Sequence, residues 1–375
     1  MRPSVGGVPS VLREASEQEA FANRLARLLT GQRTILYLGA SVTAQKESYC
    51  HAFHDLLCRV TGHAHEFHRI AEGGASSAYA LALLLQSLRD RPRRYDLVFL
   101  ETLTGDLNLL VPPAVVPAVL GATADAVRDQ GGELCMIKLP RLDRPDDHPI
   151  TLAYDESAAE LGLPVLDVSG FGRPEHGAEP LSRMALRDGI HTTEAGSVLF
   201  GASLLSRLLS PDAAWPEPRS APGFGAPLRQ RLGRLQWLLD DLDWRRTDGL
   251  ERDVFRAPSG ERVHPVVLGP AEQPIEFAFS GYIAYFLFVS APDSAMIELT
   301  FQGVARRTPL LDRYGHFPHL HMKSVFRDFR EGDEIRILGL DELPHPNPVP
   351  SEHRHLLSKH RKVRFLGVIG APGPD

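Results

Sequence analysis

Three side chains in this 375-residue chain have the types and the order that nucleophilic catalysis requires: Ser41, Asp188 and His191. A serine hydroxyl becomes a strong nucleophile only when a nearby base takes its proton. Histidine can serve as that base if an acceptor on its other ring nitrogen fixes the tautomer. Asp188 lies three residues before His191, so its carboxylate can turn back onto Nδ1 while Nε2 points outward. The three residues therefore predict a Ser–His–Asp triad.

The local sequence places Ser41 at the end of a strand. Residues 35–38 (Ile-Leu-Tyr-Leu) form a short apolar run, which is typical of a buried strand of a parallel sheet. Gly39 permits a sharp turn, and open α/β sheets bind ligands just beyond the carboxyl ends of their strands. Two alternatives stay open at this stage. Ser41 can be a helix N-cap, and Asp188-x-x-His191 can be a helix-entry loop with an incidental histidine.

A second turn with a possible catalytic use follows residues 66–70, which are expected to form a strand. Gly73 and Gly74 occupy this turn, and a glycine lets a backbone N–H approach a substrate oxygen closely. A plain strand-to-helix turn is the alternative interpretation.

Strands and helices alternate around these turns. Strands are expected over 34–38, 66–70, 96–101, 133–139 and 165–168, and helices from Ser16 to Gly31, over 46–61, after Ser77, and over 114–130, 151–161 and 193–208. This alternation predicts an α/β unit in which helices cover both faces of a parallel sheet.

The composition changes after residue 209. Residues 210–225 are rich in Pro, Gly and Ala and indicate a linker, and leucines at helical spacing predict a helix over 226–243. Short strands with turn residues between them follow from about 252, which favours a β-sandwich of jelly-roll type. The expected organisation is a tail and helix over 1–32, an α/β domain over 33–209, a linker and helix over 210–250, and a β-sandwich over 251–375.

Together, the Gly39-Ala40-Ser41 block, the Gly73-Gly74 turn and the Asp188-x-x-His191 block resemble the SGNH/GDSL hydrolase family, which usually reads Gly-Asp-Ser in the first block. The resemblance covers about residues 33–209. It implies a flavodoxin-like three-layer α/β/α domain in which Ser41 is the nucleophile, His191 the general base and Asp188 its orienting partner. It also implies that the backbone N–H groups of Ser41 and Gly74 form part of an oxyanion hole.

One block departs from the family pattern. After the strand that ends at residue 101 the family usually has Gly-x-Asn-Asp, and this chain has Gly105 where the Asn side chain would donate to the oxyanion. Loss of one such donor typically lowers the rate by about 10² to 10³. Asn108 can replace that donor if its loop turns inward, or can be a solvated loop residue. Asp106 is expected to brace the loop.

Composition and motifs argue against several classes of partner and cofactor. The net charge is −6, with 41 Lys and Arg against 47 Asp and Glu, which argues against a nucleic-acid partner. No apolar run approaches the length of a membrane span, and neither a phosphate-binding loop nor a dinucleotide fingerprint is present, so we expect no membrane partner and no cofactor. The N-terminus lacks the apolar core of a signal peptide. We therefore expect a cytoplasmic protein, although export by another route would leave the same pattern.

Two sets of histidines raise the question of a metal site. His319 and His321 share one face of an expected strand, a spacing that can hold zinc. No carboxylate or thiolate joins either set in a recognisable pattern, and the three cysteines show no paired spacing. We therefore expect no metal, and place these histidines at the surface or at the edge of a substrate site. The sets are His51, His54, His63, His65 and His68, and His316, His319 and His321.

The sequence thus predicts a serine hydrolase that cleaves an O-acyl ester, with acetyl or another small acyl group on a carbohydrate or natural product as the expected substrate. The alternatives are an acyltransferase that passes the acyl group to a hydroxyl, and a catalytically weak binding protein of the same fold. The β-domain can line the substrate cleft or serve only as a structural cap. The cleft candidates are Arg313, Tyr314, His316, Phe317, His319 and His321. The oligomeric state stays open.

Overall fold

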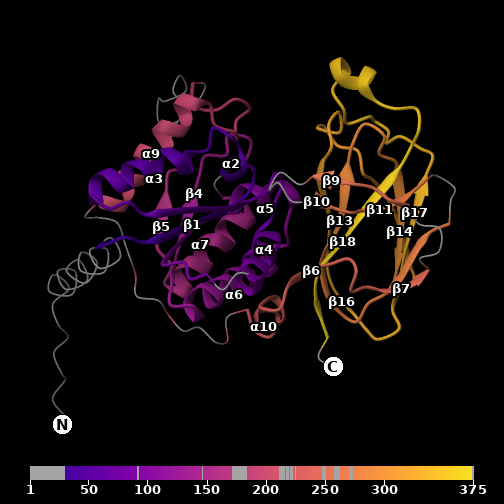
Figure 1. Ribbon diagram of the computed structural model, residues 1–375, viewed down its shortest axis with the longest axis horizontal. Helices are drawn as coiled ribbons and strands as arrows, with labels where there is room; N and C mark the ends of the chain where they lie inside the picture. Colours follow the sequence, from indigo (N-terminus) through magenta and orange to yellow (C-terminus); the bar gives the residue numbers. More distant parts are fainter. Residues whose placement is uncertain are drawn as a thin grey trace, which may run out of the picture.

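The chain folds into two units that lie side by side (Figure 1). The computed structural model describes residues 30–90, 93–145, 147–170, 184–210, 216, 219, 223, 225–246, 251–256, 262–269 and 273–373. The helix expected from Ser16 lies outside the described residues as far as residue 29, and so does most of the expected linker.

The first unit is built on a five-stranded parallel sheet in the order β2-β1-β3-β4-β5. This is the strand order of flavodoxin-like folds. The strands span Thr34–Gly39 (β1), Glu66–Ala71 (β2), Leu97–Glu101 (β3), Glu133–Lys138 (β4) and Val165–Asp167 (β5). The predicted parallel α/β sheet is confirmed, and β1 lies next to both β2 and β3.

Helices cover both faces of this sheet because side chains alternate along the buried strands. In β1, Ile35 and Tyr37 belong to one apolar cluster with α3 and α9, whereas Leu36 and Leu38 belong to another with α4, α6 and α7. The long helices are α3 (Tyr49–Thr61), α4 (Ser77–Asp90), α6 (Val116–Asp129), α7 (Pro149–Leu161) and α9 (Glu194–Leu209); the short ones are α2 (Ser41–Ala44), α5 (Leu103–Leu109) and the 3₁₀ turn Pro113–Val115. The predicted three-layer arrangement is therefore confirmed.

The second unit consists of two antiparallel sheets. One has the order β16-β13-β18-β11-β8, with β6 also beside β18, and the other has the order β15-β14-β17-β12-β7. Apolar side chains between them, including Phe277, Phe286 and Phe365, form one core, so the unit is a β-sandwich as predicted. The strands are β6 (Gln236–Leu238), β7 (Asp243–Arg246), β8 (Glu251–Arg252), β11 (Val266–Leu268), β12 (Ile275–Ala278), β13 (Gly281–Ser290), β14 (Met296–Phe301), β15 (Val304–Pro309), β16 (His319–Phe329), β17 (Glu334–Leu340) and β18 (Val363–Pro372), with β9 (Phe255–Arg256) paired to β10 (Arg262–Val263) and a 3₁₀ turn at Ser351–Leu356.

The helix predicted over 226–243 is wrong. Only α10 (Leu228–Leu232) is helical, and the chain then forms β6 and β7. The leucines have helical spacing, but tertiary contacts bury them separately: Leu235 joins the core of the α/β unit, and Leu238 joins the sandwich core. The strand-rich region therefore begins at residue 236, before the predicted boundary at 251.

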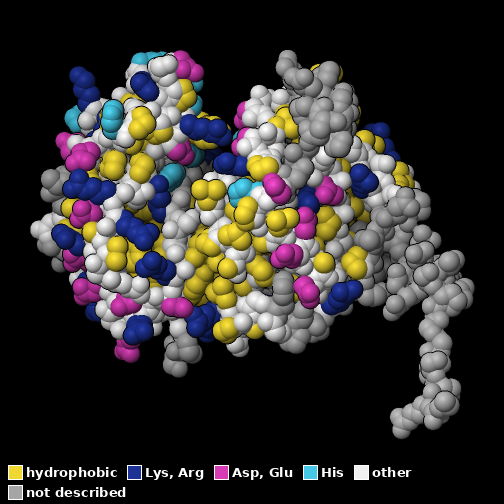
Figure 2. All heavy atoms as spheres, turned by 180° about the vertical axis from the view of Figure 1, so that it is seen from behind, with side chains coloured by type: hydrophobic (Ala, Val, Ile, Leu, Met, Phe, Trp, Pro, Cys, Tyr) yellow, Lys and Arg dark blue, Asp and Glu magenta, His cyan; other side chains and the backbone are white. Residues whose placement is uncertain are grey.

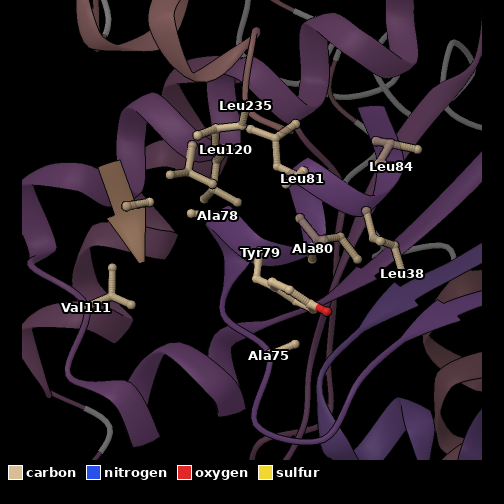
Figure 3. Packing of buried hydrophobic residues seen from close by; sticks show 14 of the residues in the cluster. Leu38, Ala75, Ala78, Tyr79, Ala80, Leu81, Leu84, Val111, Leu120 and Leu235 are labelled. Carbon is tan, nitrogen blue, oxygen red and sulfur yellow. The ribbon is translucent and has the colours of Figure 1, made fainter. Parts of the chain in front are cut away.

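An apolar interface fixes how the two units sit together. In β13, Phe286 and Phe288 enter the sandwich core, while Tyr285 and Leu287 belong to the same buried cluster as α4 and α6. Leu235 packs with side chains of the α/β unit in this cluster (Figure 3). In Figure 1, α4 and α5 face the sandwich, and the rear view in Figure 2 shows hydrophobic side chains gathered across the middle of the molecule. Because one close-packed apolar core joins the two units, they are held in a fixed relative position. A site between them therefore has a defined shape.

Candidate active site

Ser41 is the first residue of α2, directly beyond the end of β1. Ala40 is the N-cap of this helix and no side chain caps it, so the alternative of Ser41 as a capping residue is wrong. Glycine is needed at position 39 because a side chain would not fit there, and not because of its backbone φ and ψ. A Cβ at this position would lie 2.2 Å from Thr43 Oγ1 and 2.7 Å from the Glu101 carbonyl oxygen.

The fold brings Ser41, His191 and Asp188 into one hydrogen-bonded chain. His191 Nε2 lies 2.9 Å from Ser41 Oγ, and His191 Nδ1 lies 2.8 Å from Asp188 Oδ2. Because the carboxylate accepts the Nδ1 proton, Nε2 can accept the proton of the serine hydroxyl. This geometry is the one that the three-residue spacing of Asp188 and His191 predicts.

The loop that carries His191 is held in shape by its own aspartate. Asp188 Oδ1 accepts the backbone N–H groups of His191 at 2.9 Å and Ile190 at 3.2 Å. Partial burial acts to raise the pKa of Asp188, but the hydrogen bonds from His191 outweigh it and lower that pKa. Asp188 therefore stays ionised near neutral pH, and its carboxylate lies beside the His191 ring.

The Gly73–Gly74 turn lies beside Ser41 at the next strand. Gly74 has φ of +76°, a conformation that favours glycine, and within the described residues its N–H has no hydrogen-bond partner.

Asp106 holds the start of helix α4, which follows the glycine turn. It is fully buried and accepts Ser77 N–H at 2.7 Å, Ser77 Oγ at 2.6 Å and the Tyr154 hydroxyl at 2.7 Å.

The segment expected to be a loop around Asn108 is instead a helix, α5, and its packing explains Gly105. A Cβ at Gly105 would lie 1.7 Å from the Ala75 carbonyl oxygen, so this position has no room for any side chain, the family asparagine included. Asn108 lies one turn further along α5. It is exposed and lines the same cavity as Ser41 and Gly74, so it stays the candidate side-chain donor.

Replacing Gly105 with alanine is expected to lower the free energy of unfolding by about 3 kcal/mol, because the methyl group must displace the Ala75 backbone from a close-packed site. Urea unfolding followed by circular dichroism measures this change. Gly233→Ala is the matched control, since a Cβ there meets nothing closer than 3.5 Å. Equal stability of the two variants would contradict the packing argument.

Ser41 opens into a cavity of about 470 Å³ between the two units. The α/β unit supplies the wall around Ser41, and the sandwich supplies the opposite wall, so the sandwich lines the candidate site. Arg313, Tyr314, Phe317, His319 and His321 line it as anticipated for the cleft, whereas His316 is not among the lining residues and stacks on His353. The other lining residues are Glu72, Gly73, Gly74, Thr104, Gly105, Asn108, Leu109, Arg141, Ile190, His191, Asp312, Leu320 and Met322.

The arrangement of the two units has a counterpart among solved structures. No model of a protein family matches the sequence, and no curated protein matches it. The crystal structure of a two-domain esterase (CEX) active on acetylated mannans superposes with a TM-score of 0.68 at 15% identity, covering 96% of each chain. The same esterase co-crystallized with mannopentaose gives a TM-score of 0.67 at 13% identity, covering 96% of this chain and 95% of that chain.

This protein has the same two-domain fold as that esterase. The match spans both units, so the pairing of a flavodoxin-like sheet with a β-sandwich is a feature of that fold as a whole. In the described part of the chain, no helix is both long and apolar enough to cross a membrane.

The histidines around α3 and β2 serve local structure in this two-domain fold. His63 accepts the Gly31 N–H, His65 accepts the Arg33 N–H, and His54 lies 3.1 Å from the His65 carbonyl oxygen. None of the five lines the cavity at Ser41. His319 and His321 do line it, and the fold adds Asp312 to them, a carboxylate that the sequence pattern did not reveal.

Two buried carboxyl groups lie near Ser41, and sequence reasoning missed both. Glu101 accepts the Thr43 hydroxyl at 3.1 Å and the Thr104 hydroxyl at 2.5 Å, which ties α2 to α5. Burial raises the pKa of Glu101 to about 7 despite these bonds. Glu72 precedes the glycine turn, is 3% exposed and lines the cavity, and burial raises its pKa to about 7 as well.

Replacing Glu72 with glutamine is expected to change how stability depends on pH. The carboxyl of Glu72 takes up a proton on folding between its ordinary pKa of 4.5 and the folded value of about 7, so it makes the native state less stable as pH rises through that window. One proton corresponds to a slope of about 1.4 kcal/mol per pH unit. Urea unfolding at several pH values between 5 and 6.5 should show that the free energy of unfolding falls less steeply with pH in the variant than in wild type, by about this slope.

The exposed Glu331→Gln variant provides the control for the loss of a carboxylate at the surface. Parallel stability curves for wild type and Glu72→Gln across this range would show that Glu72 is ionised in the folded protein, against the prediction.

Proposed function

We propose that the protein is a serine esterase that removes small acyl groups, acetyl first among them, from a carbohydrate. The hydrogen-bonded chain Ser41–His191–Asp188, open to a cavity between the two units, carries this proposal. The two-domain fold shared with an esterase active on acetylated mannans supports the substrate class.

In this reaction Ser41 Oγ attacks the acyl carbon while His191 Nε2 takes the hydroxyl proton. The oxyanion that forms meets the N–H groups of Ser41 and Gly74 and the side-chain amide of Asn108. His191 then gives its proton to the ester oxygen of the sugar as the bond from this oxygen to the acyl carbon breaks, so the sugar departs as a free alcohol and an acetyl ester stays on Ser41. His191 takes a proton from a water molecule, whose oxygen attacks this ester. The bond between the acyl carbon and Ser41 Oγ then breaks, His191 returns the proton to Ser41 Oγ, and acetate leaves.

The sandwich wall suits a sugar better than a long acyl chain. It contributes the guanidinium of Arg313, the ring of Tyr314 and the half-exposed ring of Phe317, with the Arg313 guanidinium 4.6 Å from the centre of the Tyr314 ring. Aromatic faces and charged donors bind the C–H faces and hydroxyls of sugars. An acyltransferase would use the same triad, and only the acceptor in the second half of the reaction would differ.

The proposal is tested by measuring acetate release from chemically acetylated manno-oligosaccharides with proton NMR, with wild type beside Ser41→Ala. Release of acetate by wild type alone supports the esterase. Transfer of the acetyl group to an added unacetylated oligosaccharide, with little free acetate, would replace it with the acyltransferase. No turnover of acetylated sugars or of p-nitrophenyl acetate by the folded protein would favour a binding protein.

A further inference from the structure

A second group of chemically capable side chains lies on the sandwich side of the cavity, apart from the triad. Asp312 precedes β16, and His319 and His321 lie on β16. Asp312 Oδ2 lies 2.9 Å from His319 Nε2 and 3.3 Å from His321 Nδ1, and one ligand atom of each residue lies within 4.8 Å of the others. Alternation along β16 points both histidines to one face, while Leu320 and Met322 join the apolar cluster on the other.

The hydrogen bonds of His319 determine what can lie between it and Asp312. Its Nδ1 is 3.0 Å from the Phe317 carbonyl oxygen, which can only accept, so Nδ1 carries a proton. In a neutral ring Nε2 then presents a lone pair to the Asp312 carboxylate. Two lone pairs at 2.9 Å repel each other unless a second proton or a metal cation lies between them.

The nearby Lys323 does not neutralise the charge of the Asp312 carboxylate. Lys323 is the next residue on the same face of β16, yet it forms no ion pair with Asp312 or any other residue in the described part of the chain. The opposing charge for Asp312 must therefore come from a protonated histidine or from a metal ion.

We propose that Asp312, His319 and His321 form a binding site for a divalent transition metal, with zinc as the best match to two imidazoles and one carboxylate. The Phe317 carbonyl is the kind of partner that fixes the tautomer of a metal-binding histidine. Three protein ligands leave a fourth position for water from the cavity, which all three residues line.

The site would fix one wall of the cavity. The segment between Asp312 and His319 carries Arg313, Tyr314 and Phe317, all of which line the cavity. A metal that joins the residue before this segment to the strand after it holds these three side chains in position opposite Ser41. This role does not depend on the identity of the acyl substrate.

Zinc content measures the site directly. Protein stripped with a chelator, exposed to a small excess of zinc and then desalted should retain one zinc ion per chain by inductively coupled plasma mass spectrometry. Asp312→Asn and His319→Ala should each weaken zinc binding by at least about 10- to 100-fold in a competition titration with a chromogenic chelator. His264→Ala, an exposed histidine on the same unit, is the control and should retain the zinc.

Cobalt supplies a measurement that needs no variant. Co²⁺ added to wild type should give the intense visible bands of a four-coordinate site, and zinc should abolish them. Wild-type protein that retains no zinc above the level of His319→Ala, or Co²⁺ that gives only the weak spectrum of the hydrated ion, would overturn the proposal and leave a protonated His319 as the partner of Asp312. Ser41→Ala should bind zinc like wild type, so failure of the esterase assignment and failure of the metal site are distinguishable.

Discussion

Replacing Ser41 with alanine should lower kcat/KM for acetate release by about 10⁴-fold or more, because removal of the nucleophile leaves only the oxyanion hole and substrate binding to accelerate the reaction. Ser41 Oγ is the single hydroxyl within hydrogen-bond distance of His191 Nε2 in the described part of the chain. Initial rates on acetylated manno-oligosaccharides measure this change. Circular dichroism checks that the variant is folded.

Covalent labelling tests the same residue without a substrate. A fluorophosphonate should add one adduct to wild type by intact-protein mass and none to Ser41→Ala. Ser324→Ala, which removes an exposed hydroxyl on β16, should label and turn over like wild type. Equal labelling of wild type and Ser41→Ala would assign the nucleophile to another residue.

Replacing His191 with alanine should lower kcat/KM by about 10³- to 10⁴-fold, since the serine then has no base and the leaving group no acid. The 2.9 Å and 2.8 Å contacts of its two ring nitrogens make His191 the link between Ser41 and Asp188. If the three residues act as one unit, Ser41→Ala/His191→Ala should be no slower than Ser41→Ala alone. Steady-state kinetics of the two single variants and the double variant measure this non-additivity.

His264→Ala is the control for loss of a surface imidazole and should keep wild-type kinetics. If the loss of kcat/KM in the double variant equals the product of the losses in the two single variants, Ser41 and His191 act independently, which contradicts a triad.

Local patterns in the sequence determined most of the α/β unit. Short apolar runs such as residues 35–38 are typical of buried strands, and each strand of this sheet is followed by a helix that covers the sheet. Asp188 and His191 share one loop, so their hydrogen bond depends on local geometry that the three-residue spacing already contains. Ser41 follows a strand end, and a parallel sheet brings all such ends to one edge.

The helical spacing of apolar residues gave a wrong prediction where elements distant in the sequence bury the segment. The leucines over 226–243 repeat at helical spacing, but Leu235 is buried by the α/β unit and Leu238 by the sandwich, so the chain extends between two cores. The loop expected around Asn108 is the helix α5, because Gly105 allows it to pack against the Ala75 backbone. Neither partner is visible in the local sequence.

The sequence by itself predicted the class of chemistry, because the serine, histidine and aspartate lie in short motifs whose geometry the nearby backbone sets. The tertiary structure alone decided the distance between Ser41 and His191, which are 150 residues apart, and the cavity that the sandwich closes. It also brought Asp312 to His319 and raised the pKa of Glu72. The physical reason is common to all four: cavity shape, burial and long-range contacts arise only when separate elements pack together, and no local pattern encodes them.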